Sequence, residues 1–461
     1  PYTTLFRSGR ILVENMSQSR AARQNSIMSD TRLTWGNRYD AHRIDVFGGV
    51  RYQSSNYKLT SQRGYNTGND KYPSTNNASS FRSTWGADDK SRDITWYAQA
   101  DYNWAEKYYV EAGFSAESSS RFGDDADGLK LGGVVWGLFP SVNAAWVITN
   151  ERWLSNNKGI NYLRLNVGFD ITGNDNIDYT ASKTFFVANN MLTQKVDGKS
   201  IGNIGNTSLK WETTSRLTAG LEGNFIDNRL NVRLNYFKSW TKNLVTLRQL
   251  AWTSGLQQNW SNDGKLENEG FEAGVGVKVL NLKDFTWEMG ATAGHYKNKI
   301  TALPDGDKPF ETEAYGATIL SAVGTAAGVF YGYRTDGVYA TQAEADADGY
   351  YVIDERGDRR LFAAGDMRFI DKDGNHVIDE NDRFIIGDPN PDIYGNIYTQ
   401  LNYKRWQLNA VMCYSLGNDI YNYQRSLLEC GSRFYNQTTA MIGRWITENQ
   451  KTEIPRATYG D

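Results

Sequence analysis

The densest group of chemically competent side chains is a short acidic segment, FIDKDGNHVIDENDR, from Phe369 to Arg383. A hard cation such as Ca²⁺ takes six or more oxygen ligands, and a single twelve-residue loop can supply most of them. Counted from the first aspartate, oxygen-bearing side chains stand at positions 1, 3, 5, 9 and 12, which are Asp371, Asp373, Asn375, Asp379 and Asp382. This spacing predicts a calcium loop of the EF-hand type, structural rather than catalytic.

Two positions of this segment depart from the EF-hand pattern. His376 stands at position 6, where a sharp turn favours glycine, and Gly374 comes two places early. Position 12 is Asp382 rather than a bidentate glutamate. A solvated acidic turn without a cation is the alternative interpretation, and the sequence leaves both open.

Other metal, catalytic or nucleic-acid chemistry has little support. The three histidines are scattered, and two cysteines exclude a disulfide scaffold and a cysteine-rich zinc site. Cys413 and Cys430 could pair in an oxidising compartment or stay free. Gly198-Lys199-Ser200-Ile201-Gly202 matches the pattern Gly-x-Ser-x-Gly, but no helical pattern follows it, so it does not predict a nucleophile elbow. With 50 basic and 53 acidic residues and a net charge of −3, the chain lacks the basic surplus of a nucleic-acid-binding protein. We predict neither an enzyme nor a nucleic-acid partner.

The elements that must position the acidic loop are β-strands, because a period of two runs through the chain. In ITWYAQADYNW, Ile94 to Trp104, bulky apolar and polar residues alternate, so that they face opposite sides of a strand. The pattern predicts about eleven or twelve strands of about 9–12 residues, the length that crosses a bilayer at a tilt. Further alternating segments are residues 44–52, 108–117, 163–170, 217–221, 230–236, 271–279, 285–293 and 406–414.

The predicted connections are short on one side and long on the other. The short turns are Ala105–Lys107, Asp227-Asn228 and Asn281–Asp284, and the long polar loops are Gln53–Arg92, Ser118–Gly133, Thr172–Ser208 and Ile300–Pro391. This asymmetry is typical of a transmembrane barrel, whereas a sandwich keeps both ends similar. We predict an all-β, antiparallel transmembrane β-barrel with its apolar side toward lipid. A soluble sandwich or a β-rich adhesin, with the same aromatics in its core, is the alternative.

Several longer phrases are specific enough to indicate a family. The chain resembles the SusC/RagA family of TonB-dependent outer-membrane transporters. The matching phrases, in family order, are FPSVNAAWVITNE (Phe139–Glu151), LRLNVGFDITGNDNI (Leu163–Ile177), LKWETT (Leu209–Thr214), NRLNVRLNYFKSWTKNL (Asn228–Leu244), NEGFE (Asn268–Glu272), FYGYRTDGVY (Phe330–Tyr339), GDPNPDIYGNI (Gly387–Ile397) and IPRATYGD (Ile454–Asp461).

The resemblance implies a barrel of about 22 strands around a plug domain. Residues 10–461 would form a partial barrel, about 11–12 strands, without the plug and the TonB box that precede it and without further strands that follow. Residues 300–391 would be a long extracellular loop region that contains the acidic turn 371–382, and residues 1–9 would be a non-native scar. The family's acidic loop usually carries glycine where His376 stands.

The implied function is TonB-dependent import of a glycan or a peptide across the outer membrane, by a multi-pass barrel in contact with membrane lipid. A SusD-like surface lipoprotein would cap the extracellular loops, and TonB would act through the plug. The alternatives are a general TonB-dependent receptor for a siderophore or cobalamin, and a β-rich surface adhesin or enzyme. Substrate identity and the residues that contact substrate are not predicted.

Overall fold

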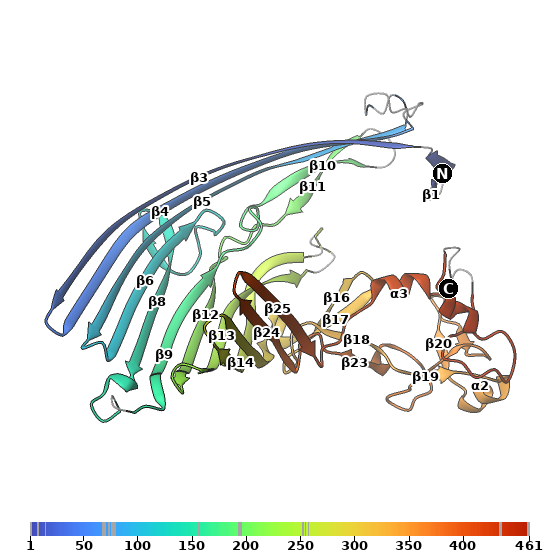
Figure 1. Ribbon diagram of the computed structural model, residues 1–461. Helices are drawn as coiled ribbons and strands as arrows, with labels where there is room; N and C mark the ends of the chain where they lie inside the picture. Colours follow the sequence, from blue (N-terminus) through green and yellow to red (C-terminus); the bar gives the residue numbers. More distant parts are fainter. Residues whose placement is uncertain are drawn as a thin grey trace. The chain divides into compact units, whose positions relative to one another are not determined.

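The computed structural model describes residues 2–6, 9–13, 15–66, 71, 74, 80–154, 157–191, 196–250, 253, 255–256, 258–432 and 436–458. Antiparallel strands dominate this part of the chain (Figure 1). The principal sheet has the order β25-β24-β15-β14-β13-β12-β9-β8-β6-β5-β4-β3, and β7 pairs with β8 beside it. Neighbours in this order are mostly neighbours in sequence, as in an up-and-down barrel wall.

The strands of this path are longer than the alternation predicts. Four of them, β3, β4, β5 and β14, have 24 or 25 residues. Their bounds are β3 (Met16–Tyr39), β4 (His42–Tyr65), β5 (Ser80–Trp104), β6 (Tyr108–Ser119), β7 (Leu129–Leu131), β8 (Val134–Val147), β9 (Ile160–Asn174), β12 (Glu212–Phe225), β13 (Leu230–Gln249), β14 (Gln258–Asn281), β15 (Phe285–Ala302), β24 (Ile393–Tyr403) and β25 (Trp406–Leu416).

The predicted long loop over Gln53–Arg92 is wrong for most of its length. β4 continues to Tyr65 and β5 begins at Ser80, and β4 also pairs with β3 along its whole length. Neither β3 nor these extensions alternate apolar with polar residues, so the sequence pattern does not reveal them. Their backbone N–H and C=O groups pair with the neighbouring strands, and this pairing does not depend on whether the side chains are apolar or polar.

The short turns are confirmed, and the long connections contain secondary structure. β5–β6, β12–β13 and β14–β15 are joined by turns of three or four residues at 105–107, 226–229 and 282–284, where the sequence predicts them. β3–β4 closes with a further short turn at residues 40–41. The long connections hold β10 (Phe185–Met191), β11 (Val196–Asn203), β16 (Phe310–Ala314), β17 (Ala317–Ser321), β18 (Val329–Tyr333), β19 (Thr335–Val338), β20 (Tyr351–Ile353), β21 (Arg359–Leu361), β22 (Met367–Phe369) and β23 (Arg383–Gly387).

In the described part of the chain, helices are few and short. They are α1 (Pro304–Asp307), α2 (Gln342–Asp348), α3 (Tyr423–Leu428) and the 3₁₀ segments η2 (Ile148–Asn150), η4 (Glu380–Asp382) and η5 (Thr439–Gly443). Within the described residues, no helix combines the length and the apolar character that a membrane-spanning helix needs. At the N-terminal end, β1 (Tyr2–Phe6) pairs with β2 (Gly9–Val13), although the alternation predicts no strand there. The origin of residues 1–9 stays a prediction.

The chain divides into two compact units, each with its own buried residues. Unit 1 comprises Pro1–Asn156, Arg164–Ala219 and Thr241–Asp263, and unit 2 comprises Asn157–Leu163, Gly220–Trp240 and Gly264–Asp461. In unit 1 a small core of Ile177, Ala181 and Leu209 lies in the loops and is covered by Phe122, Val245 and Trp260. In unit 2 the most buried apolar residues belong to the loop region before β24, and they include Val329, Tyr339, Ala345 and Ile378.

Candidate functional site

The acidic loop begins directly after β22 and ends in η4. β22 pairs with β19, and β23 follows η4 and pairs with β18, so both ends of the loop are fixed by strands. In its middle, Ile378 is buried and its N–H donates to the carbonyl of Tyr351 in β20 (2.9 Å). The loop is therefore held at three points, which limits its conformations before any ion binds.

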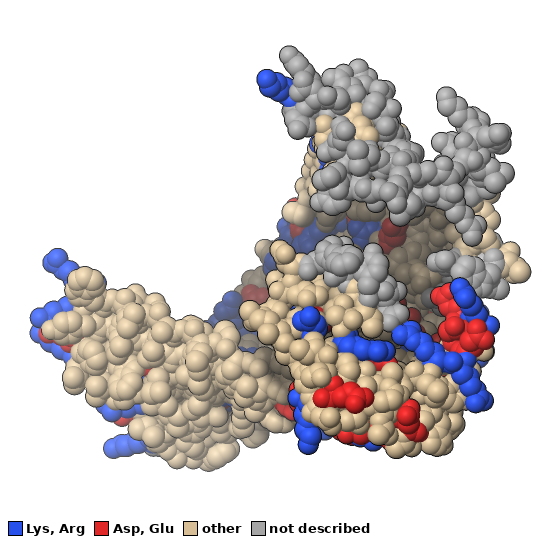
Figure 2. All heavy atoms as spheres, turned by 90° about the vertical axis from the view of Figure 1, so that its right-hand side faces the viewer, with Lys and Arg blue, Asp and Glu red and all other residues tan. Residues whose placement is uncertain are grey.

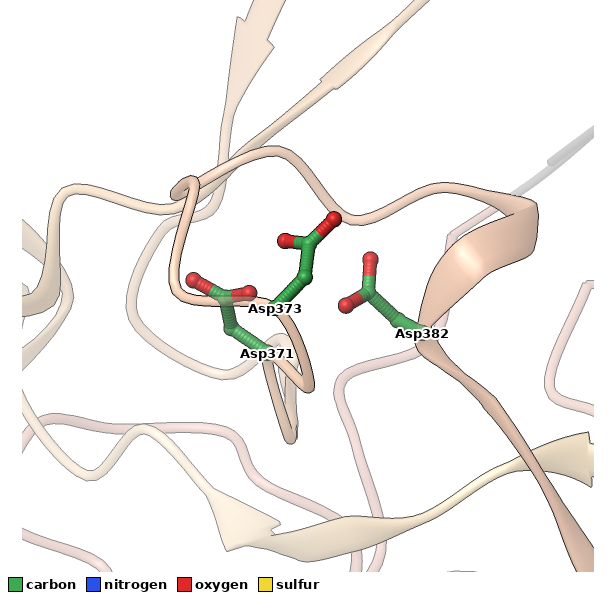
Figure 3. A group of neighbouring side chains, drawn as sticks. All are labelled: Asp371, Asp373 and Asp382. Carbon is green, nitrogen blue, oxygen red and sulfur yellow. The ribbon is translucent and has the colours of Figure 1, made fainter.

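Three of the five predicted ligands converge. One carboxylate oxygen from each of Asp371, Asp373 and Asp382 lies within 4.8 Å of the other two. Figure 3 shows the three carboxylates around a common space, two from the start of the loop and one from η4. Asp382 is fully buried, whereas Asp373 is exposed. The neighbouring cation, Lys372, directs its ammonium away, to the carbonyl of Arg383 (2.9 Å).

The two other predicted ligands make different contacts. Asp379 is outside the converging group: its carboxylate accepts from the N–H of Asn381 (2.7 Å) and caps η4. The side-chain oxygen of Asn375 accepts from the N–H of Val377 (2.6 Å). The structure thus brings together the carboxylates of Asp371, Asp373 and Asp382. Asn375 and Asp379 instead accept backbone hydrogen bonds within the turn.

His376 reproduces the backbone that glycine normally provides. Its φ is 61°, in the left-handed region, and its Nδ1 lies 3.0 Å from the carbonyl oxygen of Asp348 at the end of α2. Its N–H donates to Asp371 (2.9 Å), and the N–H of Gly374 donates to the other oxygen of the same carboxylate (2.8 Å). The departure at position 6 changes the residue but not the turn.

These hydrogen bonds also set the charge of the loop. Partial burial raises the pKa of Asp371, but the N–H groups of His376 and Gly374 outweigh it, and the pKa lies below its usual value. Beneath the loop, the guanidinium of Arg368 binds both oxygens of Asp348 (2.8 and 3.2 Å), and the hydroxyl of Tyr339 donates to the same carboxylate (3.1 Å). Burial and this carboxylate raise the pKa of Tyr339, so it stays a neutral donor.

A second candidate surface is the apolar face of the principal sheet. In unit 1, Val46, Ala100, Ala112, Val142 and Phe169 form one row across five paired strands. Among the residues that the structure describes, no second layer covers this face: Trp96 is 54% exposed, Phe114 45% and Val142 50%. In unit 2 the register extends the same pattern through Val275, Ala291, Ile397 and Met412.

Aromatic side chains border this face near the short turns. Ring centroids of Trp104 and Tyr108 are 5.5 Å apart, and those of Tyr108 and Trp146 are 6.3 Å apart. The Tyr108 hydroxyl and the indole N–H of Trp146 both donate to Glu151 (2.7 and 3.3 Å). Aromatic rings with one polar end are typical of a membrane–water interface.

The opposite face of the sheet is polar and internally bonded. In unit 1, Arg216 binds both oxygens of Asp170 (3.1 and 3.2 Å), and Asp30 receives hydrogen bonds from Tyr97 and Arg51. Charged side chains of both signs also mix on the surface drawn in Figure 2, with broad uncharged areas between them. A face of this kind suits contact with water rather than with lipid.

In unit 2 the polar face contains a hollow of about 400 Å³. The Tyr394 hydroxyl donates to Glu272 (3.0 Å) beside it, and a Cβ on Gly294 would come within 2.5 Å of the Tyr394 ring. Polar residues that line it are Arg233, Asn235, Glu272, Thr292, Tyr394 and Asn396. This hollow was not predicted from the sequence, in which the glycines at inward positions of β14 and β15 are the one signal for it.

The fold and these two faces define a β-barrel wall of the outer membrane, apolar outside and polar inside. A profile of the family described as "TonB dependent receptor-like, beta-barrel" matches residues 2–358. The chain therefore belongs to the TonB-dependent receptors, and its relatives place it with the SusC/RagA type.

Named relatives agree with this assignment. The chain is 30% identical to TonB-dependent receptor P3 of Formosa agariphila over 438 residues, 93% of this chain and 42% of the relative. It is 27% identical to TonB-dependent receptor SusC of Bacteroides thetaiotaomicron, over 71% of this chain and 31% of that protein. The RagAB peptide importer in its closed-closed state shares the fold, with a TM-score of 0.75 at 20% identity over 96% of this chain and 47% of that one. The chain spans less than half the length of these proteins.

The remaining predicted features have simple outcomes. Cys413 and Cys430 are both exposed, and no disulfide joins them to each other. The names of the relatives are those of receptors and an importer, none of an enzyme. The structure adds residues that sequence reasoning missed, namely Asp348, Tyr339 and Arg368 under the acidic loop. Asp348 and Tyr339 precede Asp371 by 23 and 32 positions, whereas Arg368 precedes it by three. No spacing rule connects these residues with the acidic loop.

Proposed function

We propose that the protein containing this chain imports a large polar nutrient, a glycan or a peptide, across the outer membrane by TonB-dependent transport. The observation that carries the proposal is the uncovered apolar face, whose Trp, Phe and Val side chains stay exposed while the opposite face is polar. Lipid on one side and water on the other satisfy both faces at once. The hollow beside Glu272 and Tyr394 supports a path for a hydrated molecule, since Arg233 and other polar side chains in its lining offer hydrogen-bond donors and acceptors.

The proposal includes two protein partners. A TonB complex supplies energy through a plug domain, and a SusD-like lipoprotein covers the extracellular loops over the substrate. The names of the RagAB importer and of SusC support this arrangement. Transport by binding and release requires no bond-breaking groups, so we also propose that the protein is not an enzyme.

The function is tested by uptake in the organism that carries the gene. Deletion should abolish growth on one class of polymer, either an oligosaccharide or a peptide, and a plasmid copy should restore it. Growth loss only on ferric chelates or cobalamin would instead identify the general receptor class. Normal growth and uptake on all these nutrients would overturn the proposal.

We propose further that the acidic loop binds a structural Ca²⁺. Three converging carboxylates repel one another unless a cation neutralises them, and the hydrogen bonds to Asp371 keep it ionised. Asp371, Asp373 and Asp382 would hold the ion, and Asn375 and Asp379 would support the turn. The ion would join β22, η4 and the strand pair β20–β21 through one loop.

Chelation and one matched pair of variants test the cation. EDTA should raise protease cleavage within residues 371–382, and Ca²⁺ should restore protection. Asp373→Asn should weaken Ca²⁺ binding by about tenfold or more, because one charged ligand is lost. The control is Asp354→Asn, since Asp354 also accepts from two backbone N–H groups in a turn but lies outside the cluster. Equal cleavage with and without chelator would leave only the solvated turn.

A further inference from the structure

A second charged feature lies on the outward face of unit 1, beyond the apolar band. It consists of Arg23, Lys58, Lys90 and Arg92, which we call the outer basic cluster. All four side chains are exposed. We infer that this cluster, with the hollow beneath it, binds the phosphate group of a lipid in the outer leaflet of the outer membrane. This goes beyond nutrient import, because the ligand is part of the membrane itself.

Strand register places the four residues on the lipid-facing side. Val46 and Val50 of β4 face outward with Ala100 and Trp96 of β5, and no register shift interrupts β4 and β5 between Trp104 and Arg82. Because side chains alternate, Lys58, Lys90 and Arg92 share that face. On β3, Trp35 pairs with Val46 and Arg23 with Lys58, so Arg23 also faces outward.

The cluster lies at the height of a lipid head group. The apolar band of β5 comprises the eleven residues from Trp104 to Ile94. The ten steps between them correspond to about 33 Å of strand and about 25 Å of membrane depth at a tilt of about 40°. Arg92 comes two residues later, about 5 Å beyond the band, and the Lys58 level is about 15 Å beyond it. β6 stops pairing with β5 at Asp93, whereas β3, β4 and β5 continue beyond this level side by side (Figure 1).

The positive charge of the cluster is only partly neutralised. Asp88 lies on the same face, and its carboxylate oxygens are 3.5 Å from the Lys58 ammonium and 3.7 Å from the Lys90 ammonium. Both distances are longer than those of a strong, hydrogen-bonded ion pair. Arg23 and Arg92 form no ion pair with any residue in the described part of the chain, and Arg23 contacts only the amide oxygen of Asn25 (3.4 Å). Four cations against one carboxylate leave a net positive site at the level where lipid phosphates lie.

A hollow of about 410 Å³ lies directly below, at the upper edge of the apolar band. Its outward-facing lining is Tyr52, Ile94, Ser118 and Val134, with Arg92 at its charged side. Two carboxylates also line it, Asp93, which receives the hydroxyl of Ser119 (2.6 Å), and Asp124 in the following loop. An apolar wall under an arginine matches an acyl chain whose head group carries phosphate.

The occupant that fits both features is a phosphorylated glycolipid of the outer leaflet. Its acyl chains match the apolar wall and its phosphate matches the guanidinium and ammonium groups, since Arg binds phosphate in a bidentate manner. A soluble anion would bind the outer basic cluster without using the apolar lining of the hollow. An uncharged lipid would contact the apolar lining without using the basic cluster. Both serve as comparison ligands in the test.

The test uses the whole protein that contains this chain, purified in detergent and stripped of lipid. Native mass spectrometry measures retention of added monophosphoryl lipid A, of the same lipid after its phosphate is removed, and of inorganic phosphate. The triple variant Lys58→Gln/Lys90→Gln/Arg92→Gln should bind monophosphoryl lipid A at least about tenfold more weakly, because each basic residue near a membrane surface contributes measurably to anionic-lipid binding.

The control removes three other positive charges, with Lys283→Gln/Lys404→Gln/Arg405→Gln, from the short, exposed turns β14–β15 and β24–β25 of unit 2. It should bind the lipid like the wild type. Arg92→Gln alone should show an intermediate loss, which serves if the triple variant fails to fold. Equal binding by wild type and triple variant, or equal binding of the phosphorylated and dephosphorylated lipids by wild type, would overturn the inference. Tight binding of inorganic phosphate alone would do the same.

Discussion

At the scale of single residues, His376 shows how a rule of sequence can be satisfied by an unexpected side chain. Left-handed backbone costs a non-glycine residue about 1–3 kcal/mol unless the surroundings hold it. Here the ring nitrogen of His376 lies against the carbonyl of Asp348, and its N–H binds Asp371. The contacts that offset the strain also tie the acidic loop to α2.

This geometry predicts opposite outcomes for two substitutions. His376→Gly should keep the turn and change Ca²⁺ affinity by less than about threefold, since glycine adopts φ of 61° without strain. His376→Val should destabilise the loop by about 1–3 kcal/mol and weaken Ca²⁺ binding, because a β-branched residue disfavours this region. Calcium titration by calorimetry measures both. Equal affinities for the two variants would contradict the role given to the backbone of His376.

At the scale of elements, side chains that alternate along each long strand give it one apolar face and one polar face. Val142 and Asn143 are neighbours in β8, yet Val142 lies in the exposed apolar row and Asn143 donates to Glu111 on the polar face (3.3 Å). The same alternation explains why β6, β8 and β9 could be predicted from the sequence. β3 could not be predicted, because it carries polar residues on both faces over much of its length.

A charge should therefore be tolerated on one face only. Val142→Arg should destabilise the folded protein in lipid by about 2–4 kcal/mol, because the row lies near mid-membrane. Asn143→Arg, one position along and facing Glu111, should cost less than about 1 kcal/mol. Chemical unfolding in vesicles measures the two free energies. A larger loss for Asn143→Arg would mean that the faces are assigned the wrong way round.

At the scale of the whole molecule, the exposed apolar rows indicate that the outward face contacts lipid rather than water. A water-soluble monomer rarely exposes an apolar patch of more than a few hundred Å². Both units of this protein present Trp, Phe, Leu and Val side chains on the outward face, many of them between 40% and 60% exposed. In unit 2, strongly buried residues such as Tyr339 and Ala345 lie in the loop region and not in the strands of the principal sheet.

The chain should accordingly need detergent or lipid. Expressed by itself in aqueous buffer it should aggregate, and in detergent micelles it should give a circular-dichroism spectrum dominated by β-structure. Light scattering and sedimentation measure the first outcome. A soluble monomer without detergent would contradict the outward assignment of these rows and favour the adhesin or enzyme alternative.

The sequence alone determined the period-two strands that have one apolar face, their short turns and the five acidic-loop positions, because each depends on residues close together in the chain. It did not reveal β3 or the extensions of β4 and β5, whose pairing depends on neighbouring backbone rather than on side-chain alternation.

Only the tertiary structure decided which ligands converge, how His376 fits and where the outer basic cluster lies. Asp382 reaches Asp371 and Asp373 because η4 turns the chain back, and Arg23 meets Lys58 because strand register aligns them. Such meetings depend on register and loop closure over long separations, which no local pattern in one sequence encodes.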